Sequence, residues 1–151
     1  MRIAVDVMGG DHGCGIVIGG VKQALQSNPD ISEAFLVGDQ TQISESLRKL
    51  SFQDARIKTV HASEVLTMDD KPVEGLRKKR DCSILRAVDL LKEGRADALI
   101  SPGNTGGLAA ASTIRLRKLE GVDRVGIATV IPAPRNEFVL LDSGANVESR
   151  P

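Results

Sequence analysis

The sequence contains no tryptophan and no tyrosine, and aromatic residues make up only 2% of its 151 positions. Proteins that stack single-stranded bases on aromatic platforms need more of these side chains. An excess of one charge is also missing, because 20 lysines and arginines balance 20 aspartates and glutamates. No overall electrostatic field therefore attracts the chain to nucleic acid or to an anionic membrane surface. We expect a protein that does not bind nucleic acid.

Long apolar runs are absent as well. No stretch approaches the roughly 18 apolar residues of a membrane-spanning helix. The first apolar run ends at Asp6, so it has the length of a buried strand and is too short for the apolar core of a signal peptide. The two cysteines, Cys14 and Cys82, lie far apart and form no CxxC pair. This pattern argues against a metal site and against a disulfide, and it predicts a cytoplasmic protein.

The residues that are present predict an α/β protein with a largely parallel sheet. Apolar residues make up 41% and charged residues 26%, as in soluble globular domains. Short β-branched runs alternate with segments of helical period, which is typical of this fold class. The expected strands are 3–7, 34–37, 57–60 and 98–101, and the expected helices cover about 17–25, 43–50, 84–91 and 107–118.

Three further segments need separate predictions. Residues 61–80 are polar and lack a clear period, which predicts a long loop with one helical turn after Pro72. Asp81 or Ser83 is expected to cap the helix that follows, and Gly94 is expected to end it. Strands at 125–131 and 138–141 are expected to pair as a hairpin or to meet at a tight corner.

Glycine and small polar residues follow three of the expected strands, at residues 6–11, 101–107 and 142–146. Glycine lets a backbone approach a ligand closely, and the N-terminus of a following helix offers unpaired N–H groups to an anion. Each segment could also be a tight turn, because none matches the dinucleotide or P-loop spacing. Ligands bind at the carboxyl ends of strands in open α/β sheets, so convergence of these loops at one sheet edge favours a phosphate or oxyanion site.

Some single residues allow two interpretations. Asp6 and Asp11 suggest a metal ligand or a general base, but capping of the next helix is the commoner role for Asp11. His61 follows a strand at its carboxyl end, where a residue that transfers protons to a ligand would lie. A single histidine without a partner is more often structural. The basic run at 77–80 is either a solvated face or a patch for an acidic protein or a phosphate.

Four motifs together resemble the PlsX family of phosphate acyltransferases. They occur in the family's order at residues 6–11 (DVMGGD), 77–84 (RKKRDCSI), 93–106 (EGRAD followed by SPGNTG) and 140–146 (LLDSGAN), and they span nearly the whole chain. The resemblance implies a three-layer α/β/α fold with a mostly parallel sheet, similar to isocitrate and isopropylmalate dehydrogenases. It also implies that residues 1–151 are the N-terminal part of a domain whose C-terminal half is absent.

The resemblance further implies an activity. A fatty acyl group would move from acyl carrier protein to inorganic phosphate, giving acyl phosphate for phospholipid synthesis, without a metal or an organic cofactor. The implied protein is a cytoplasmic homodimer that associates peripherally with the membrane through the missing half. Two alternatives stay open, namely a phosphotransacylase that uses acyl-coenzyme A and an inactive fragment that only binds ligand.

Site residues follow from the motifs and the loop chemistry together. The expected catalytic residues are Asn104, Thr105, Asp142 and Asn146. The expected phosphate- and substrate-binding residues are Gly9, Gly10, Asp11, Ser101, Gly103, Gly106 and Gly144. The expected contacts to the acidic carrier protein are Arg77, Lys78, Lys79 and Arg80. The absence of a Ser–His–Asp or Cys–His set favours direct attack by phosphate over an acyl-enzyme.

Overall fold

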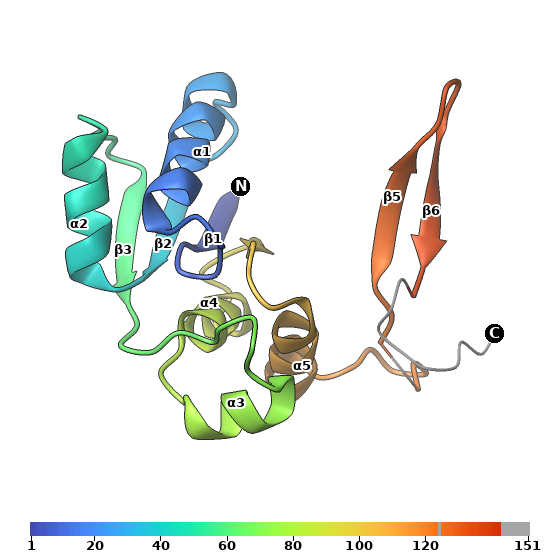
Figure 1. Ribbon diagram of the computed structural model, residues 1–151. Coiled ribbons are helices and arrows are strands. Elements are labelled where there is room, and N and C mark those ends of the chain that lie inside the picture. Colours follow the sequence, from blue (N-terminus) through green and yellow to red (C-terminus); the bar gives the residue numbers. More distant parts are fainter. Residues whose placement is uncertain (124, 143–151) are drawn as a thin grey trace. The chain divides into compact units, whose positions relative to one another are not determined.

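The computed structural model describes residues 1–123 and 125–142, and the chain divides into two compact units, Met1–Leu116 and Arg117–Pro151 (Figure 1). The first unit holds a four-stranded sheet in the order β3-β2-β1-β4. Its strands are β1 (Arg2–Asp6), β2 (Glu33–Gly38), β3 (Ile57–His61) and β4 (Ala98–Ile100). Every neighbouring pair in it is parallel, which confirms the predicted sheet.

Helices cover both faces of this sheet. Their bounds are α1 (Cys14–Ser27), α2 (Gln40–Lys49), α3 (Pro72–Lys78), α4 (Ser83–Lys92) and α5 (Thr105–Leu116). Alternate residues of a strand point to opposite faces, so Ile3 and Val5 pack with α1 and α2 whereas Ala4 packs with α4. The central strands are buried on both faces, as parallel strands usually are. The unit therefore has three layers, as predicted.

The segment between β3 and α4 differs from its prediction. It contains the two-turn helix α3, which begins with Pro72 at a position where the missing N–H costs nothing. The predicted capping of α4 is wrong, because Cys82 occupies the N-cap position and makes no side-chain capping bond. Asp81 instead accepts hydrogen bonds from the backbone N–H and the hydroxyl of Ser63. Gly94, at φ 66°, follows the end of α4 as predicted.

The second unit contains an antiparallel pair, β5 (Ala128–Pro132) and β6 (Glu137–Leu141). The predicted hairpin is therefore confirmed. These two strands form a sheet of their own, so the prediction that the 142–146 loop follows a strand of the main sheet is wrong. The alternating pattern of β5 and the exposed residues of β6 suit a two-stranded ribbon rather than a buried parallel strand.

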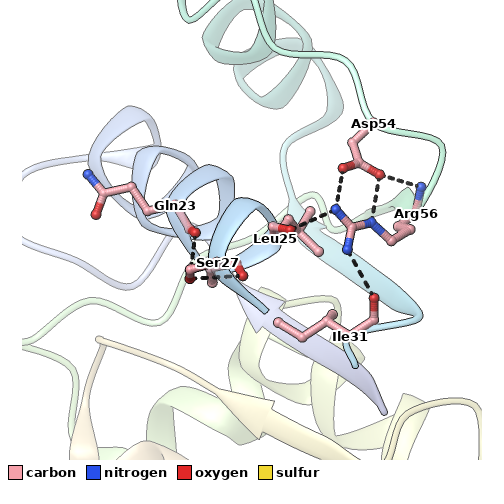
Figure 2. Close-up of polar contacts among 7 residues, drawn as sticks. Gln23, Leu25, Ser27, Ile31, Asp54 and Arg56 are labelled. Atoms are coloured by element: carbon pink, nitrogen blue, oxygen red, sulfur yellow. Dashed lines mark hydrogen bonds and ion pairs between the residues drawn. The ribbon is translucent and has the colours of Figure 1, made fainter. Parts of the chain in front are cut away.

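Arg56 ties the start of β3 to the connection between α1 and β2 (Figure 2). Its guanidinium donates to the carbonyl oxygens of Leu25 at 2.8 Å and Ile31 at 3.3 Å. The carboxylate of Asp54 holds the same guanidinium at 2.7 Å, and this contact lowers the pKa of Asp54 to about 2. The ion pair lies at the amino ends of the strands, so it supports the sheet from the edge opposite the glycine-rich loops.

Candidate anion-binding site

The loops that follow β1 and β4 are in direct backbone contact. The two strands are neighbours in the sheet, so their carboxyl ends meet at one edge. A Cβ atom built on Gly9 would lie 2.7 Å from the Cα of Gly103, and one built on Gly103 would lie 2.9 Å from the Cα of Gly9. No larger residue fits at either position without moving backbone. The predicted convergence is therefore confirmed for these two loops.

A buried carboxylate lies beneath this contact. Asp6 is 0% exposed, and its Oδ2 atom accepts a hydrogen bond of 2.7 Å from the hydroxyl of Ser101. Its Oδ1 atom accepts from the backbone N–H of Met8 at 3.1 Å. The N–H of Gly103 donates to the Ser101 hydroxyl oxygen at 3.2 Å. Ser101 thus directs its proton to Asp6 and accepts from the loop, so its hydroxyl hydrogen does not face a ligand.

Asn104 caps α5 from inside the protein. It is 7% exposed, its Oδ1 atom accepts from the N–H of Gly107 at 2.8 Å, and its own carbonyl oxygen accepts the first bond of the helix. Its Nδ2 atom donates to the carbonyl oxygens of Thr67 and Asp70, each at 3.1 Å. The expected direct contact between this side chain and phosphate therefore needs correction, because both ends of the amide are already bound within the protein.

The first two N–H groups of α5 remain for a ligand. Thr105 and Gly106 are exposed, and the first N–H groups of a helix have no acceptor within it. The positive end of the helix dipole adds to this preference for an anion. Pro72 closes one side, because a Cβ atom on Gly106 would lie 2.8 Å from its Cγ atom. The arrangement can hold a phosphate or an oxyanion against N–H groups and the Thr105 hydroxyl.

The structure places none of the remaining expected site residues at the N-terminus of α5. Asp11 is exposed and does not cap α1, because Gly13 occupies the N-cap position with φ 80° and no side-chain bond. Gly10 lies beside Pro102, at 3.6 Å from a built Cβ atom to the Pro102 Cγ atom. Asp142 belongs to the second unit, whose placement against the first is not defined. Gly144 and Asn146 lie outside the described residues.

The basic run at 77–80 divides into two groups. Arg77, Lys78 and Arg80 are exposed at the end of α3. Lys79 is half-buried, and its Nζ atom donates to the carbonyl oxygen of Val65 at 2.9 Å and to Asp70. Lys79 therefore has an internal role that its sequence context did not indicate, and the exposed surface of the run comes from the other three residues.

The turn that receives the Asn104 amide is held by Asp70. This carboxylate accepts from Lys79 and from the N–H and hydroxyl of Thr67. The Lys79 ammonium, followed by the Thr67 N–H, lowers the pKa of Asp70 to about 2.

We predict a pH effect on the capped helix from this lowered pKa. The ionised form is favoured in the folded state, so Asp70 contributes stability above its ordinary pKa of about 3.9 and loses that contribution as the pH falls toward 2. The protection factor of the Gly107 amide, taken against the intrinsic exchange rate at each pH, should therefore fall over this range. Asp70→Asn should make Gly107 exchange fast already at neutral pH. Asp97→Asn, at the other sheet edge, should leave it slow, and equal rates in both variants would contradict the prediction.

Structural signals for a metal or a membrane span are absent from the described residues. Within 1–123 and 125–142, no three histidine, cysteine, aspartate or glutamate side chains are grouped so that they could hold a metal ion. No helix in the same part of the chain has the length and apolar character needed to cross a bilayer. The histidine singled out in the sequence, His61, accepts a hydrogen bond of 3.3 Å from the N–H of Gln40 and so supports the start of α2.

Comparisons with known proteins agree with the fold and the motifs. A family described as "Fatty acid synthesis protein" matches residues 1–151. The phosphate acyltransferases of Legionella pneumophila (strain Paris) and Clostridium acetobutylicum are 48% identical over 152 residues and 38% identical over 151 residues. The matches cover 99% and 100% of this chain but 44% and 45% of those proteins, so the chain spans less than half the length of these curated relatives.

A solved structure shares the architecture at low sequence identity. The EutD phosphotransacetylase from Staphylococcus aureus superposes with a TM-score of 0.65 at 17% identity, over 99% of this chain and 48% of that one. At this identity the likeness concerns the fold alone, a parallel sheet with flanking helices.

Proposed function

Because the chain belongs to the fatty acid synthesis protein family, whose curated members are named phosphate acyltransferases, we propose that it carries the phosphate-binding part of an enzyme that transfers an acyl group to inorganic phosphate. The observation that supports this role most strongly is the backbone contact between Gly9 and Gly103. This contact aligns the β1 loop with the N-terminus of α5, where the first N–H groups have no acceptor within the helix.

The reaction requires little covalent chemistry from the protein. Inorganic phosphate is an oxygen nucleophile, and a thioester is an activated acyl donor. Attack of a phosphate oxygen on the thioester carbon would give a tetrahedral oxyanion, which collapses with loss of the thiolate to acyl phosphate. The protein needs to hold the two reactants together and to stabilise the oxyanion. We assign these roles to the N–H groups of Thr105 and Gly106 and to the Thr105 hydroxyl.

The remaining expected residues take supporting parts in this proposal. Gly9, Gly10 and Gly103 let the two loops meet, while Ser101 and Asn104 hold the loop that precedes α5. Asp11 would line the exposed side of the site. Asp142, Gly144 and Asn146 stay proposed site residues because they belong to the family-like motif at 140–146.

Acyl carrier protein is the proposed acyl donor. Arg77, Lys78 and Arg80 present three exposed positive charges at the end of α3, and an acidic partner would be steered toward them. We further propose that the product feeds phospholipid synthesis, and that the full-length enzyme is a cytoplasmic homodimer with peripheral membrane contact outside residues 1–151. The alternative donor is acyl-coenzyme A, which is also anionic and would use the same charges.

The experiment that tests the function is acyl phosphate formation by this chain from inorganic phosphate and a long-chain acyl thioester. We expect phosphate-dependent product with acyl carrier protein as donor, and a rate at least about 10-fold lower when Arg77, Lys78 and Arg80 are all changed to glutamine, because steering is lost. Changing the distant surface residues Lys49 and Arg48 to glutamine should have no effect. A higher rate with acyl-coenzyme A than with acyl carrier protein would favour the alternative donor.

A further inference from the structure

We propose that Asp6 is a positioning residue for the phosphate site, acting through Ser101 on the loop that leads into α5. The proposal rests on the proposed function, since it assigns a role in that same site. Asp6 does not touch the exposed N–H groups itself. It lies one strand away and is joined to the loop before them by two hydrogen bonds, from the Ser101 hydroxyl to Asp6 and from the Gly103 N–H to that hydroxyl.

The burial of Asp6 shows how strongly this arrangement is constrained. The side chain is 0% exposed, and no lysine or arginine among the described residues forms an ion pair with it. A buried carboxylate is costly unless hydrogen bonds satisfy it. The N–H of Met8 and the hydroxyl of Ser101 supply those bonds, so Asp6 fixes one residue in the β1 loop and one in the β4 loop.

The direction of the bonds gives Asp6 a specific effect. A carboxylate only accepts, so it receives the hydrogen bond that the Ser101 hydroxyl donates and leaves the lone pairs of the hydroxyl oxygen to accept from the loop. The Gly103 N–H uses one of these lone pairs, which sets the conformation of the turn immediately before the N-cap residue Asn104. The positions of the next two N–H groups, those of Thr105 and Gly106, depend on this turn.

The same geometry excludes Asp6 as a general base in this conformation. The side chain is 0% exposed, each of its oxygens already accepts from a protein donor, and Gly9 lies against it, with a built Gly9 Cβ atom 2.8 Å from the Asp6 Oδ2 atom. A phosphate bound at Thr105 would meet the N–H groups rather than the carboxylate. Asp6 therefore sets the geometry of the anion site without adding its charge to the ligand contacts.

Asp6→Asn and Ser101→Ala test the relay, by which we mean the two hydrogen bonds from the Gly103 N–H to Ser101 and from Ser101 to Asp6. Ser101→Thr is the conservative variant that keeps the hydroxyl. With its Oδ1 atom kept on the Met8 N–H, an asparagine places its Nδ2 donor against the Ser101 hydroxyl, so the bond to Ser101 reverses. Asp39→Asn is the matched control, because Asp39 follows the neighbouring strand and its carboxylate caps α2 through the N–H of Gln42, outside the bonds that join Asp6, Ser101 and Gly103. We would measure amide hydrogen exchange at Gly103 without ligand, and the Kd for inorganic phosphate by titration.

The relay predicts faster exchange at Gly103 and an approximately 10-fold weaker Kd for phosphate in Asp6→Asn and Ser101→Ala, corresponding to about 1.4 kcal/mol. Ser101→Thr should restore both values, and Asp39→Asn should change neither. Unchanged Gly103 exchange in folded Ser101→Ala would overturn the relay. Phosphate binding by Asp6→Asn equal to that of the unaltered chain would overturn the positioning role. Failure of the unaltered chain to bind phosphate, with the exchange pattern as predicted, would contradict the proposed function and not the relay.

Discussion

Replacing Gly103 by alanine is expected to abolish phosphate binding and any acyl transfer that depends on it. The added Cβ atom would lie 2.9 Å from the Gly9 Cα atom and 3.2 Å from the Gly9 carbonyl oxygen, and both are backbone atoms that no rotamer change can move. The β1 and β4 loops must then separate, and the turn before Asn104 moves with them. Because a displacement of about 1 Å in a positioned site can cost 100-fold in rate, we expect at least that loss of activity.

A helical glycine provides the matched control for this substitution. Gly19 lies within α1, and a Cβ atom built on it meets nothing within 4 Å. Gly19→Ala should leave phosphate binding unchanged and stabilise the fold by up to about 1 kcal/mol, because alanine favours a helix interior. Measurement of phosphate Kd and urea unfolding for both variants separates a local clash from general damage. Normal phosphate affinity in Gly103→Ala would contradict the account of the loop contact.

Replacing Asn104 by alanine is expected to destabilise the first unit by about 2–4 kcal/mol. The change removes the N-cap bond to Gly107, which is worth about 1 kcal/mol. It also leaves the carbonyl oxygens of Thr67 and Asp70 without their donor, at about 1–3 kcal/mol. Activity should fall as well, although the side chain makes no contact with phosphate in this structure, because α5 would no longer be fixed against the turn at 67–70.

Asn104→Asp separates the two halves of this role. Aspartate keeps an oxygen that accepts from the Gly107 N–H, but it places a second acceptor against the carbonyl oxygens of Thr67 and Asp70. We therefore expect at least as large a loss in the free energy of unfolding as for alanine, measured by urea denaturation. Asn28→Ala, an exposed asparagine with one local bond, should cost less than about 1 kcal/mol. A fully stable Asn104→Asp variant would contradict the stabilising role of the bonds from Nδ2 to Thr67 and Asp70.

The sequence predicted the sheet well because each strand carries its own signal. Short β-branched runs marked β1 to β4, and apolar residues at helical spacing marked α1, α2 and α4. The placement of the 142–146 loop at the edge of the main sheet failed, although the hairpin itself was predicted, because a hairpin strand and a parallel edge strand have similar local patterns. Only pairing partners distinguish them, and those are set by tertiary structure.

The site could be predicted in position but not in detail. Glycines and small polar residues after two strands located it, because parallel strands end at a common edge. The inward direction of the Asn104 side chain could not be predicted from the sequence. Its partners are backbone carbonyl oxygens at 67–70, and every residue type carries such an oxygen. The same holds for the bond between Asp6 and Ser101, which lie 95 residues apart in the chain.

The most direct test of the phosphate site is a titration of this chain with inorganic phosphate, followed through the backbone amide resonances of Thr105 and Gly106. A saturable shift of these two resonances, lost in Gly103→Ala and unchanged in Gly19→Ala, is the predicted result. Phosphate that instead shifts only the resonances of Arg77, Lys78 and Arg80, or none in a folded chain, would show that the N-terminus of α5 is not the anion-binding site.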